Sequence, residues 1–262
     1  MDKTLRTAAT GLTAQQRYVE IISNNLANVN TTGFKKIRPE FQDLLYETLR
    51  PAGNTARVAV EPLNEVQIGS GTELVATTKL FGQGDVEQSN NPLDMAINGQ
   101  GFFVVRKADN SLAYTRDGSF QLDRNGRMVT TQGHILEPGF TIPQDAVELQ
   151  VSRDGMLSIL LEGGVDTQTL GQIELARFIN PAGLRSTGDN LFVETPASGE
   201  AIFEIPGENN TGELIQSHLE TSNVDVVEEM VNMITAQRSY ELNSKSVRTA
   251  DDILATAVNL KR

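Results

Sequence analysis

Two stripes of small and apolar residues, one at each end of the chain, constrain the fold more than any other feature of the sequence. Near the N-terminus these residues recur at alternating steps of three and four from Leu5 to Val29, and the same alternation runs from Val226 to Val258. Such a repeat is typical of the buried seam of a coiled coil. The sequence therefore predicts two long terminal helices that pack side by side, as an antiparallel or a swapped pair. The predicted seam residues include Leu5, Leu12, Val19, Ile22, Leu26 and Val29 in the first helix, and Val226, Met230, Met233, Tyr240, Val247, Asp251 and Leu254 in the second.

Capping residues indicate where both helices begin or end. Asp225 can accept hydrogen bonds from the first turn of the second helix, and Glu228 stands three residues later in the position of a capping box. The first helix is expected to end between Asn30 and Gly33, because asparagine and glycine tolerate the left-handed backbone conformation that ends helices.

The sequence between the two stripes has the pattern of short strands. Apolar runs at 101–106, 147–151, 157–161 and 172–178 are separated by turn-forming pairs such as Asp-Gly and Asn-Gly. This pattern predicts a mainly antiparallel all-β domain inserted between the helices, and hence an α+β chain. The expected parts are a helical coiled-coil core domain at 1–30 and 222–262, an irregular connector at 31–69 with a short amphipathic helix near Glu40–Leu49, and a β-rich outer domain at 70–221.

The polar face of the first helix carries almost no charge. Between Thr7 and Phe34 the only charged residues are Arg17 and Glu20. A helix that faces water is normally rich in Lys and Glu, whereas uncharged polar side chains can be buried against neighbours without the cost of desolvating an ion. This pattern predicts a helix surrounded by copies of itself, as in a polymer subunit. A poorly formed helix that faces solvent is the alternative.

Composition argues against several classes of function. The 262 residues carry 22 basic and 34 acidic side chains, and the net charge of −12 opposes binding to the phosphate backbone of nucleic acids. Apolar runs are shorter than the roughly 18 residues of a membrane span, and the N-terminal residues lack the apolar run of a secretory leader. We therefore expect neither nucleic-acid binding, nor membrane insertion, nor export by a cleavable Sec signal. Without cysteine the chain can form no disulfide and no thiolate metal site.

No set of residues has the spacing of a catalytic or metal site. His134 and His218 lack a second ligand at metal-binding spacing. Neighbouring acids such as Glu228 and Glu229 point about 100° apart on a helix, so they do not converge on one substrate. We therefore expect no catalytic residue, no cofactor and no metal, and an enzyme is the weakest hypothesis.

Several segments of the chain resemble one known family. The stretches A-A-T-G-L-T-A-Q-Q at 8–16 and I-I-S-N-N-L-A-N-V-N-T-T-G-F-K at 21–35 are similar to the N-terminal signature of bacterial flagellar rod and hook proteins. The similarity continues beyond residue 40 and covers nearly the whole chain. The combination of D-L-L-Y-E-T at 43–48 with E-M-V-N-M-I-T-A-Q-R-S-Y-E-L-N-S-K at 229–245 looks most like the subunits of the distal rod.

The resemblance implies a structural subunit that polymerises into a rigid, hollow helical drive shaft, which transmits torque through the periplasm to the hook. In this family the terminal helices form the inner core of the tube, and the β domain lies outside. The implied location is the periplasmic rod of the flagellar basal body. The implied partners are other copies of the chain, proximal rod proteins below, hook protein above, the P-ring and L-ring, the flagellar type III export apparatus and a rod-cap chaperone.

The resemblance also suggests roles for the unusual run of asparagines at the end of the first helix. The first pair, Asn24 and Asn25, is expected to hydrogen-bond adjacent subunits, and a purely local capping role is the alternative. The later part of the run is expected to end the helix and turn the chain outward. The residues assigned to this helix end and intersubunit turn are Asn24, Asn25, Asn28, Asn30, Gly33 and Phe34.

Two alternative functions stay open at this point. Within the same family the chain could be a proximal rod protein. In a different class it could be a cell-surface or phage-tail binding module that is trimerised by coiled-coil ends. Such a module would need charge-decorated coiled coils and exposed aromatic clusters on the β domain, and the sequence offers neither pattern.

Overall fold

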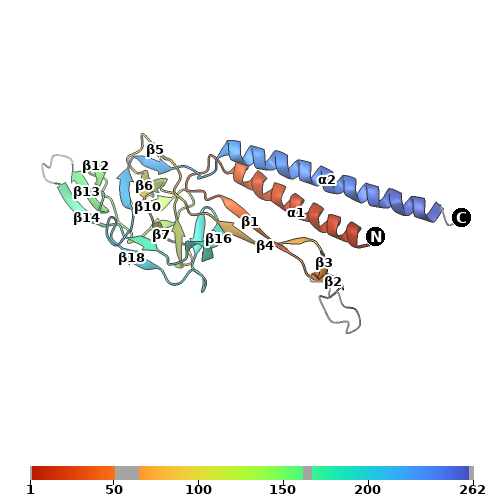
Figure 1. The fold of residues 1–262 in the computed structure, drawn as a ribbon. Helices are drawn as coiled ribbons and strands as arrows, with labels where there is room; N and C mark the ends of the chain where they lie inside the picture. The colour runs from red at the N-terminus through yellow and green to blue at the C-terminus, as the bar shows by residue number, and fades with distance from the viewer. Residues whose placement is uncertain (1, 51–64, 162–166, 260–262) are drawn as a thin grey trace, which may run out of the picture. The chain divides into compact units, whose positions relative to one another are not determined.

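The computed structural model describes residues 2–50, 65–161 and 167–259, which form two compact units. Unit 1 combines both ends of the chain with residues 37–78, and unit 2 contains residues 27–36 and 79–224. Two long helices lie in unit 1, and antiparallel strands make up most of the remaining regular structure (Figure 1). The expected α+β class is therefore confirmed for the described residues.

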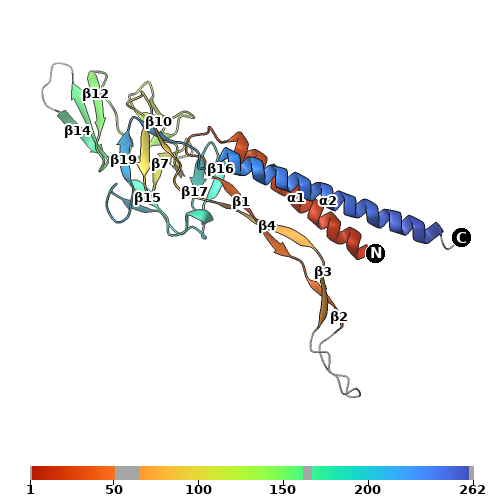
Figure 2. The ribbon, with the colours of Figure 1, turned by 45° about the horizontal axis from the view of Figure 1, so that its top comes forward.

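The two helices of unit 1, α1 (Asp2–Ala27) and α2 (Val226–Asn259), lie side by side in opposite directions (Figures 1 and 2). At one end of the pair, Asn25 donates a hydrogen bond to Glu229, and further along Gly11 lies against the side chain of Asn243. Small side chains are prominent in the buried face of the pair, which allows the backbones to approach closely. Buried residues of the two helices include Ala8, Ala14, Ile22, Asn25, Glu229, Ala236 and Ala250.

The start of α2 agrees with the predicted cap. The carboxylate of Asp225 accepts hydrogen bonds from the backbone N–H groups of Val227 at 2.8 Å and Glu228 at 3.1 Å. These two groups have no partner within the helix, so the side chain satisfies donors that would otherwise depend on water.

The buried face of α2 differs from the predicted seam. The predicted seam residues near the N-terminus are all buried or partly buried. In α2, Val226, Met230, Tyr240 and Asp251 are exposed, Met233 and Val247 are partly buried, and the side chain of Leu254 lies outside the described residues. The stripe of small residues that includes Ala236 and Ala250 is buried instead, because small residues permit the closest approach to α1. The assignment of those four exposed residues to a seam within the chain is therefore wrong, and their role in assembly stays a prediction.

Residues 37–79 correct the expected connector. The segment contains β1 (Ile37–Asp43), β2 (Tyr46–Arg50), β3 (Val66–Gly69) and β4 (Thr72–Lys79), in which β1 pairs with β4 and β2 pairs with β3. The predicted amphipathic helix near Glu40–Leu49 is therefore absent. Leu44 N–H donates to Gly71 C=O at 2.9 Å, so the backbone of this segment finds its partners about thirty residues further along the chain, which a local pattern does not reveal. Most of the segment 51–71, which shows no clear sequence period, lies outside the described residues.

Unit 2 is built from short antiparallel strands. Its largest sheet has the order β16-β17-β8-β7-β11-β10-β9, with β15 pairing both β7 and β18, and a second sheet has the order β12-β13-β14. Two further pairs are β6 with β19 and β5 with β20. The strands are β5 (Val86–Gln88), β6 (Met95–Asn98), β7 (Phe102–Arg106), β8 (Leu112–Thr115), β9 (Phe120–Leu122), β10 (Met128–Thr130), β11 (Ile135–Leu136), β12 (Ala146–Val151), β13 (Met156–Leu161), β14 (Thr167–Gln172), β15 (Leu175–Arg177), β16 (Arg185–Gly188), β17 (Leu191–Val193), β18 (Ile202–Glu204), β19 (Glu213–Gln216) and β20 (His218–Glu220), and Pro181–Gly183 form a single 3₁₀ turn, η1.

Alternating side chains of β7 divide the core of unit 2 into two clusters. Phe103 and Val105 belong to the larger cluster, and Phe102 and Val104 belong to the smaller, aromatic one. The rings of Phe102 and Phe178 meet edge to face with their centroids 5.7 Å apart. The strands expected at 101–106, 147–151 and 157–161 are confirmed as β7, β12 and β13.

Candidate functional site

The segment that follows α1 belongs to unit 2. Helix α1 ends at Ala27, and a turn follows in which Thr31 N–H donates to Asn28 C=O at 3.1 Å. The hydroxyl of Thr31 also donates to Asn28 Oδ1 at 3.2 Å. Asn28 thus lies in the turn that follows the helix, which ends earlier than the predicted range Asn30–Gly33, and the role of Asn28 in ending the helix stays a prediction. Asn30 lies exposed in the same turn.

Gly33 occupies a position that only glycine fits well. Its φ of +65° is the left-handed conformation, and its N–H donates to Glu220 C=O at 2.9 Å. A Cβ atom on Gly33 would lie 2.6 Å from the backbone nitrogen of Asp117. The expectation of a left-handed glycine was therefore correct, and the added finding is the close approach of a second backbone.

The residue after Gly33 packs beside an unusual cation. Phe34 is buried, and its ring centroid lies 5.8 Å from Nζ of Lys79, which is also 4.7 Å from the ring centroid of Phe192. Burial lowers the pKa of Lys79 from its ordinary value. The two aromatic faces offset part of the cost of burying the ammonium group.

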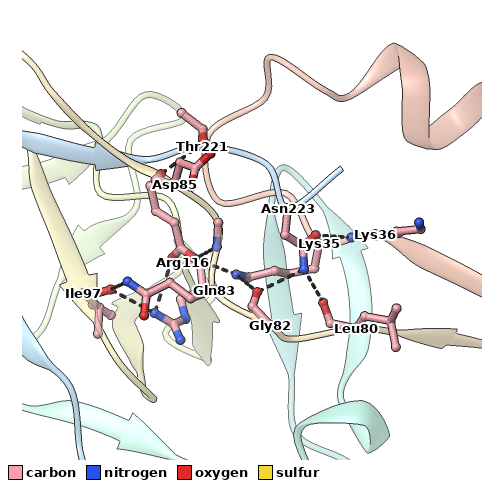
Figure 3. Close-up of polar contacts among 12 residues, drawn as sticks. Lys35, Lys36, Leu80, Gly82, Gln83, Asp85, Ile97, Arg116, Thr221 and Asn223 are labelled. Atoms are coloured by element: carbon pink, nitrogen blue, oxygen red, sulfur yellow. Dashed lines mark hydrogen bonds and ion pairs between the residues drawn. The ribbon is translucent and has the colours of Figure 1, made fainter. Parts of the chain in front are cut away.

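Lys35, Glu220 and Arg116 form a buried ionic cluster, which we call the anchor cluster. Lys35 Nζ lies 2.6 Å from Glu220 Oε1, and Arg116 Nη1 lies 3.3 Å from Glu220 Oε2. The side chains of Lys35 and Glu220 are 0% exposed, and that of Arg116 is 3% exposed. In Figure 3, Lys35 and Arg116 come from different segments of unit 2, with Gly82, Gln83 and Asp85 close by.

Backbone groups complete the anchor cluster. Lys35 Nζ donates to Gly82 C=O at 2.7 Å, Arg116 Nη2 donates to Gly99 C=O at 2.6 Å, and Gly84 N–H donates to Glu220 Oε1 at 2.9 Å. Two cations nevertheless share one carboxylate. Burial lowers the pKa of Lys35, while the charge of Glu220 opposes this shift, and burial also lowers the pKa of Arg116. Arg116 Nε is buried without a hydrogen-bond partner among the described residues.

Asn223 joins three segments of unit 2 next to the anchor cluster. Its Oδ1 accepts a hydrogen bond from Lys36 N–H at 2.7 Å. Its Nδ2 donates to Leu80 C=O at 2.8 Å and to Gly82 C=O at 3.0 Å (Figure 3). The segment that continues from α1 and the segment that leads into α2 are therefore held to the same stretch of chain.

Asn25 corrects a prediction about contacts between subunits. Its side chain is buried in unit 1, where Oδ1 accepts a hydrogen bond from Ile37 N–H and Nδ2 donates to Ile37 C=O, both at 2.9 Å. Nδ2 also lies 3.0 Å from the carboxylate of Glu229. These bonds within one chain occupy the amide, so the expected hydrogen bond to an adjacent subunit is wrong for Asn25. Asn24 is exposed, and its intersubunit role stays a prediction.

Helix α2 also carries exposed apolar side chains on the side opposite its buried face. Val227 is 71% exposed and Ile234 is 51% exposed, although both are large apolar side chains. With about 100° between successive residues, these side chains lie on the side of α2 away from Ala236 and Ala250. We define the outer face of α2 as Val227, Met230, Val231, Ile234 and Leu242, all of which are exposed.

The same unit has further surfaces that could receive another molecule. A groove of about 660 Å³ lies between the helices and is lined by residues that include Val19 and Tyr240. In the described part of the chain, no three His, Asp or Glu side chains are grouped as metal ligands. No described helix is both long and apolar enough to cross a membrane. The surfaces described for unit 1 are the outer face of α2 and this groove between the helices.

Sequence reasoning missed the anchor cluster entirely. Lys35 and Glu220 are 185 positions apart in the chain, and each stands beside turn-forming residues, where a charged side chain normally faces water. The one local indication was Gly33, a glycine at a position where its backbone lies close to the backbone of Asp117.

Comparisons with known proteins place the chain in a family. Three family models match: the flagella basal body rod protein at residues 5–35, the flagellar hook protein FlgE/F/G D1 domain at 96–159, and the flagellar basal body rod FlgEFG protein C-terminal at 215–260. The chain is 48% identical to the flagellar basal-body rod protein FlgG of Borreliella burgdorferi, and the match covers all of both chains. It is 47% identical to the protein of that name from Buchnera aphidicola subsp. Schizaphis graminum over 94% of each chain, and 46% identical to that of Caulobacter vibrioides over 98% of each. Identity of this extent over the full length shows that the chain belongs to the FlgG family of flagellar basal-body rod proteins.

Proposed function

We propose that the chain is a structural subunit of the distal rod of the bacterial flagellum, and that it polymerises into a rigid, hollow helical drive shaft. Full-length similarity to proteins named for the basal-body rod supports this assignment, and the FlgG name favours the distal over the proximal rod. The subunit performs no catalysis. Its work is mechanical, because it carries torque through the periplasm to the hook.

The observation that carries the proposal is the outer face of α2. Large apolar side chains on a helix are normally buried, and in the single chain α1 covers only the opposite side of α2. Burying a large apolar side chain fully contributes roughly 1.5–3 kcal/mol, so completing the burial of five half-exposed residues contributes several kcal/mol. Contact with α1 or α2 of neighbouring copies provides that burial.

The proposed arrangement gives each unit a place in the rod. The terminal helices form the inner core as a coiled coil between copies, and the β-rich unit forms the outer layer. Exposed apolar residues of the segment 37–79, such as Leu45, bridge neighbouring subunits. Proximal rod proteins bind below and hook protein binds above, while the P-ring and L-ring surround the shaft. The chain reaches the periplasmic rod through the flagellar type III export apparatus with the help of a rod-cap chaperone.

A matched pair of substitutions tests the proposal. Ile234→Glu places a charge on the outer face of α2, and Ile179→Glu makes the same change at a residue of unit 2 that is 81% exposed. We expect sedimentation and electron microscopy at increasing protein concentration to show tubes for the wild-type chain and Ile179→Glu, but not for Ile234→Glu. Equal assembly of all three proteins, or an equal loss in both variants, would contradict a role for this face.

A further inference from the structure

The anchor cluster fastens two segments that are far apart in the sequence but lead directly into the two helices. The carboxylate of Glu220 contacts Gly84 N–H, Lys35 Nζ and Arg116 Nη1, and the backbone C=O of Glu220 accepts a hydrogen bond from Gly33 N–H. Two of these donors lie in the segment that follows α1, and Glu220 itself lies five residues before the cap of α2. One residue therefore connects both segments to the strands of unit 2.

Stability does not explain why this connection is ionic. Burying charged groups carries a desolvation cost that often exceeds the attraction between them, and well-packed apolar residues of similar volume are frequently as stable or more stable. Here the cost is aggravated because two cations share one carboxylate and Arg116 Nε lacks a partner among the described residues. The ionic arrangement adds directionality: the cations meet their acceptors at fixed positions, whereas apolar contacts tolerate sliding.

We propose that Glu220 is a positioning residue, which holds the segment after α1 and the segment before α2 in one fixed register on unit 2. Lys35 and Arg116 serve as its counterions. Without Glu220 the strands of unit 2 keep their fold, but the two segments lose their defined positions.

Hydrogen exchange measured residue by residue on the dilute full-length chain tests this inference in Glu220→Gln. The amides of Gly33 and Lys36 are the reporters, because they donate to Glu220 C=O and to Asn223 Oδ1, and the substitution leaves both acceptors in place. We expect both amides to exchange at least tenfold faster, while amides of β7 and β13 keep their wild-type rates. Unchanged rates at Gly33 and Lys36, or an equal acceleration in the core strands, would overturn the positioning role.

Further variants separate positioning from stability. Glu204→Gln weakens a partly exposed ion pair, between Arg177 on β15 and Glu204 on β18, and should leave the reporter amides unchanged. In the triple variant Lys35→Met, Arg116→Met, Glu220→Leu, the buried charges are gone. We expect its core melting temperature to return to the wild-type value or higher, with Gly33 and Lys36 still exchanging fast. If the apolar triple variant restores slow exchange at both amides, packing alone positions the segments and the inference fails.

This inference concerns the folded monomer and can be judged apart from the proposed function. Sedimentation of Glu220→Gln adds a second readout, in which we expect misshapen or fewer tubes than the wild-type chain forms. If the wild-type chain itself does not assemble, the proposed function fails while the exchange result stands. If the wild-type chain assembles and exchange is unaffected in the variant, only the positioning role fails.

Discussion

Two neighbouring asparagines show how burial decides the role of a residue. The side chain of Asn25 forms hydrogen bonds with the backbone N–H and C=O of Ile37 and with the carboxylate of Glu229, whereas Asn24 is exposed. Asn25→Asp removes the amide donor and buries a negative charge beside Glu229. We expect a loss of about 3 kcal/mol of unfolding free energy for Asn25→Asp, against less than about 0.5 kcal/mol for Asn24→Asp. Urea unfolding of both variants checks this, and equal losses would contradict the assignment.

Gly33 allows a second comparison between matched residues. Gly33→Ala introduces strain at φ +65° and a methyl group 2.6 Å from the nitrogen of Asp117, whereas Gly199, at φ +78°, has no atom within 4 Å of a Cβ. We expect Gly199→Ala to cost about 1 kcal/mol of unfolding free energy, from backbone conformation alone. Gly33→Ala should cost at least twice as much in the same urea titration. A smaller loss at Gly33 would mean that the chain relaxes around the methyl group.

The titration of Tyr114 gives a prediction about pH. Burial, with the nearby charge of Glu194, raises the pKa of Tyr114 to about 12. In the unfolded chain this phenol ionises near its ordinary value of 10.0, so between these two values the unfolded state releases a proton that the folded state keeps. Stability should therefore fall in this range, by up to about 1.4 kcal/mol per pH unit.

Absorbance of tyrosinate measures this directly, because the chain has four tyrosines and no tryptophan. We expect the last of the four ionisation steps in the folded protein to be absent from Tyr114→Phe. If the variant keeps that step, another tyrosine is responsible for it.

At the scale of elements, the sequence predicts features that depend on neighbouring residues, such as turns, caps and single strands. It does not predict features that depend on residues far apart in the chain, such as strand pairing. The turn at Asn28, the cap at Asp225 and strand β7 follow from residues close together in the chain. Strands β1 and β2 lie where the sequence predicts a connector with a short helix. Their partners, β4 and β3, follow only after an intervening segment, so the local pattern does not reveal the pairing. In α2 the predicted stripe lies one position away from buried residues such as Ala236 and Ala250, because its large apolar side chains, such as Met230, dominate the sequence pattern. The anchor cluster joins residues from three separate segments, so no local pattern could indicate it.

The antiparallel alignment of α1 and α2 can be tested by crosslinking, because the wild-type chain has no cysteine. A Cβ on Gly11 would lie 2.9 Å from the amide nitrogen of Asn243, which is compatible with a disulfide between these positions. We expect the double variant Gly11→Cys, Asn243→Cys to form an intrachain disulfide on mild oxidation. The pair Gly11→Cys, Gln237→Cys is the control, because the second residue lies nearly two turns away. Equal crosslinking of both pairs would contradict the alignment.

At the scale of the whole molecule, the two units differ in how they are stabilised. Both hydrophobic clusters formed by the described buried residues lie in unit 2, whereas the buried residues of α1 and α2 are mostly small. A helix pair with little large apolar area buried depends on further contacts for its stability. The chain thus combines a β unit that has its own hydrophobic clusters with helices that bury mostly small side chains, and under the proposed function other copies cover the exposed apolar surface of the helices.

This difference predicts two unfolding transitions that respond differently to concentration. In a dilute solution of the full-length chain, the helical signal at 222 nm should be lost at a lower urea concentration than the near-ultraviolet tertiary signal of Tyr114 and the phenylalanines of unit 2. Raising the protein concentration should shift only the helical transition to higher urea, because assembly binds the folded helices and not the unfolded ones. Ile234→Glu should abolish this shift while leaving the transition of unit 2 in place. A single transition that is independent of concentration would mean that the helices are stabilised within one chain, and the outer face of α2 would then need another explanation.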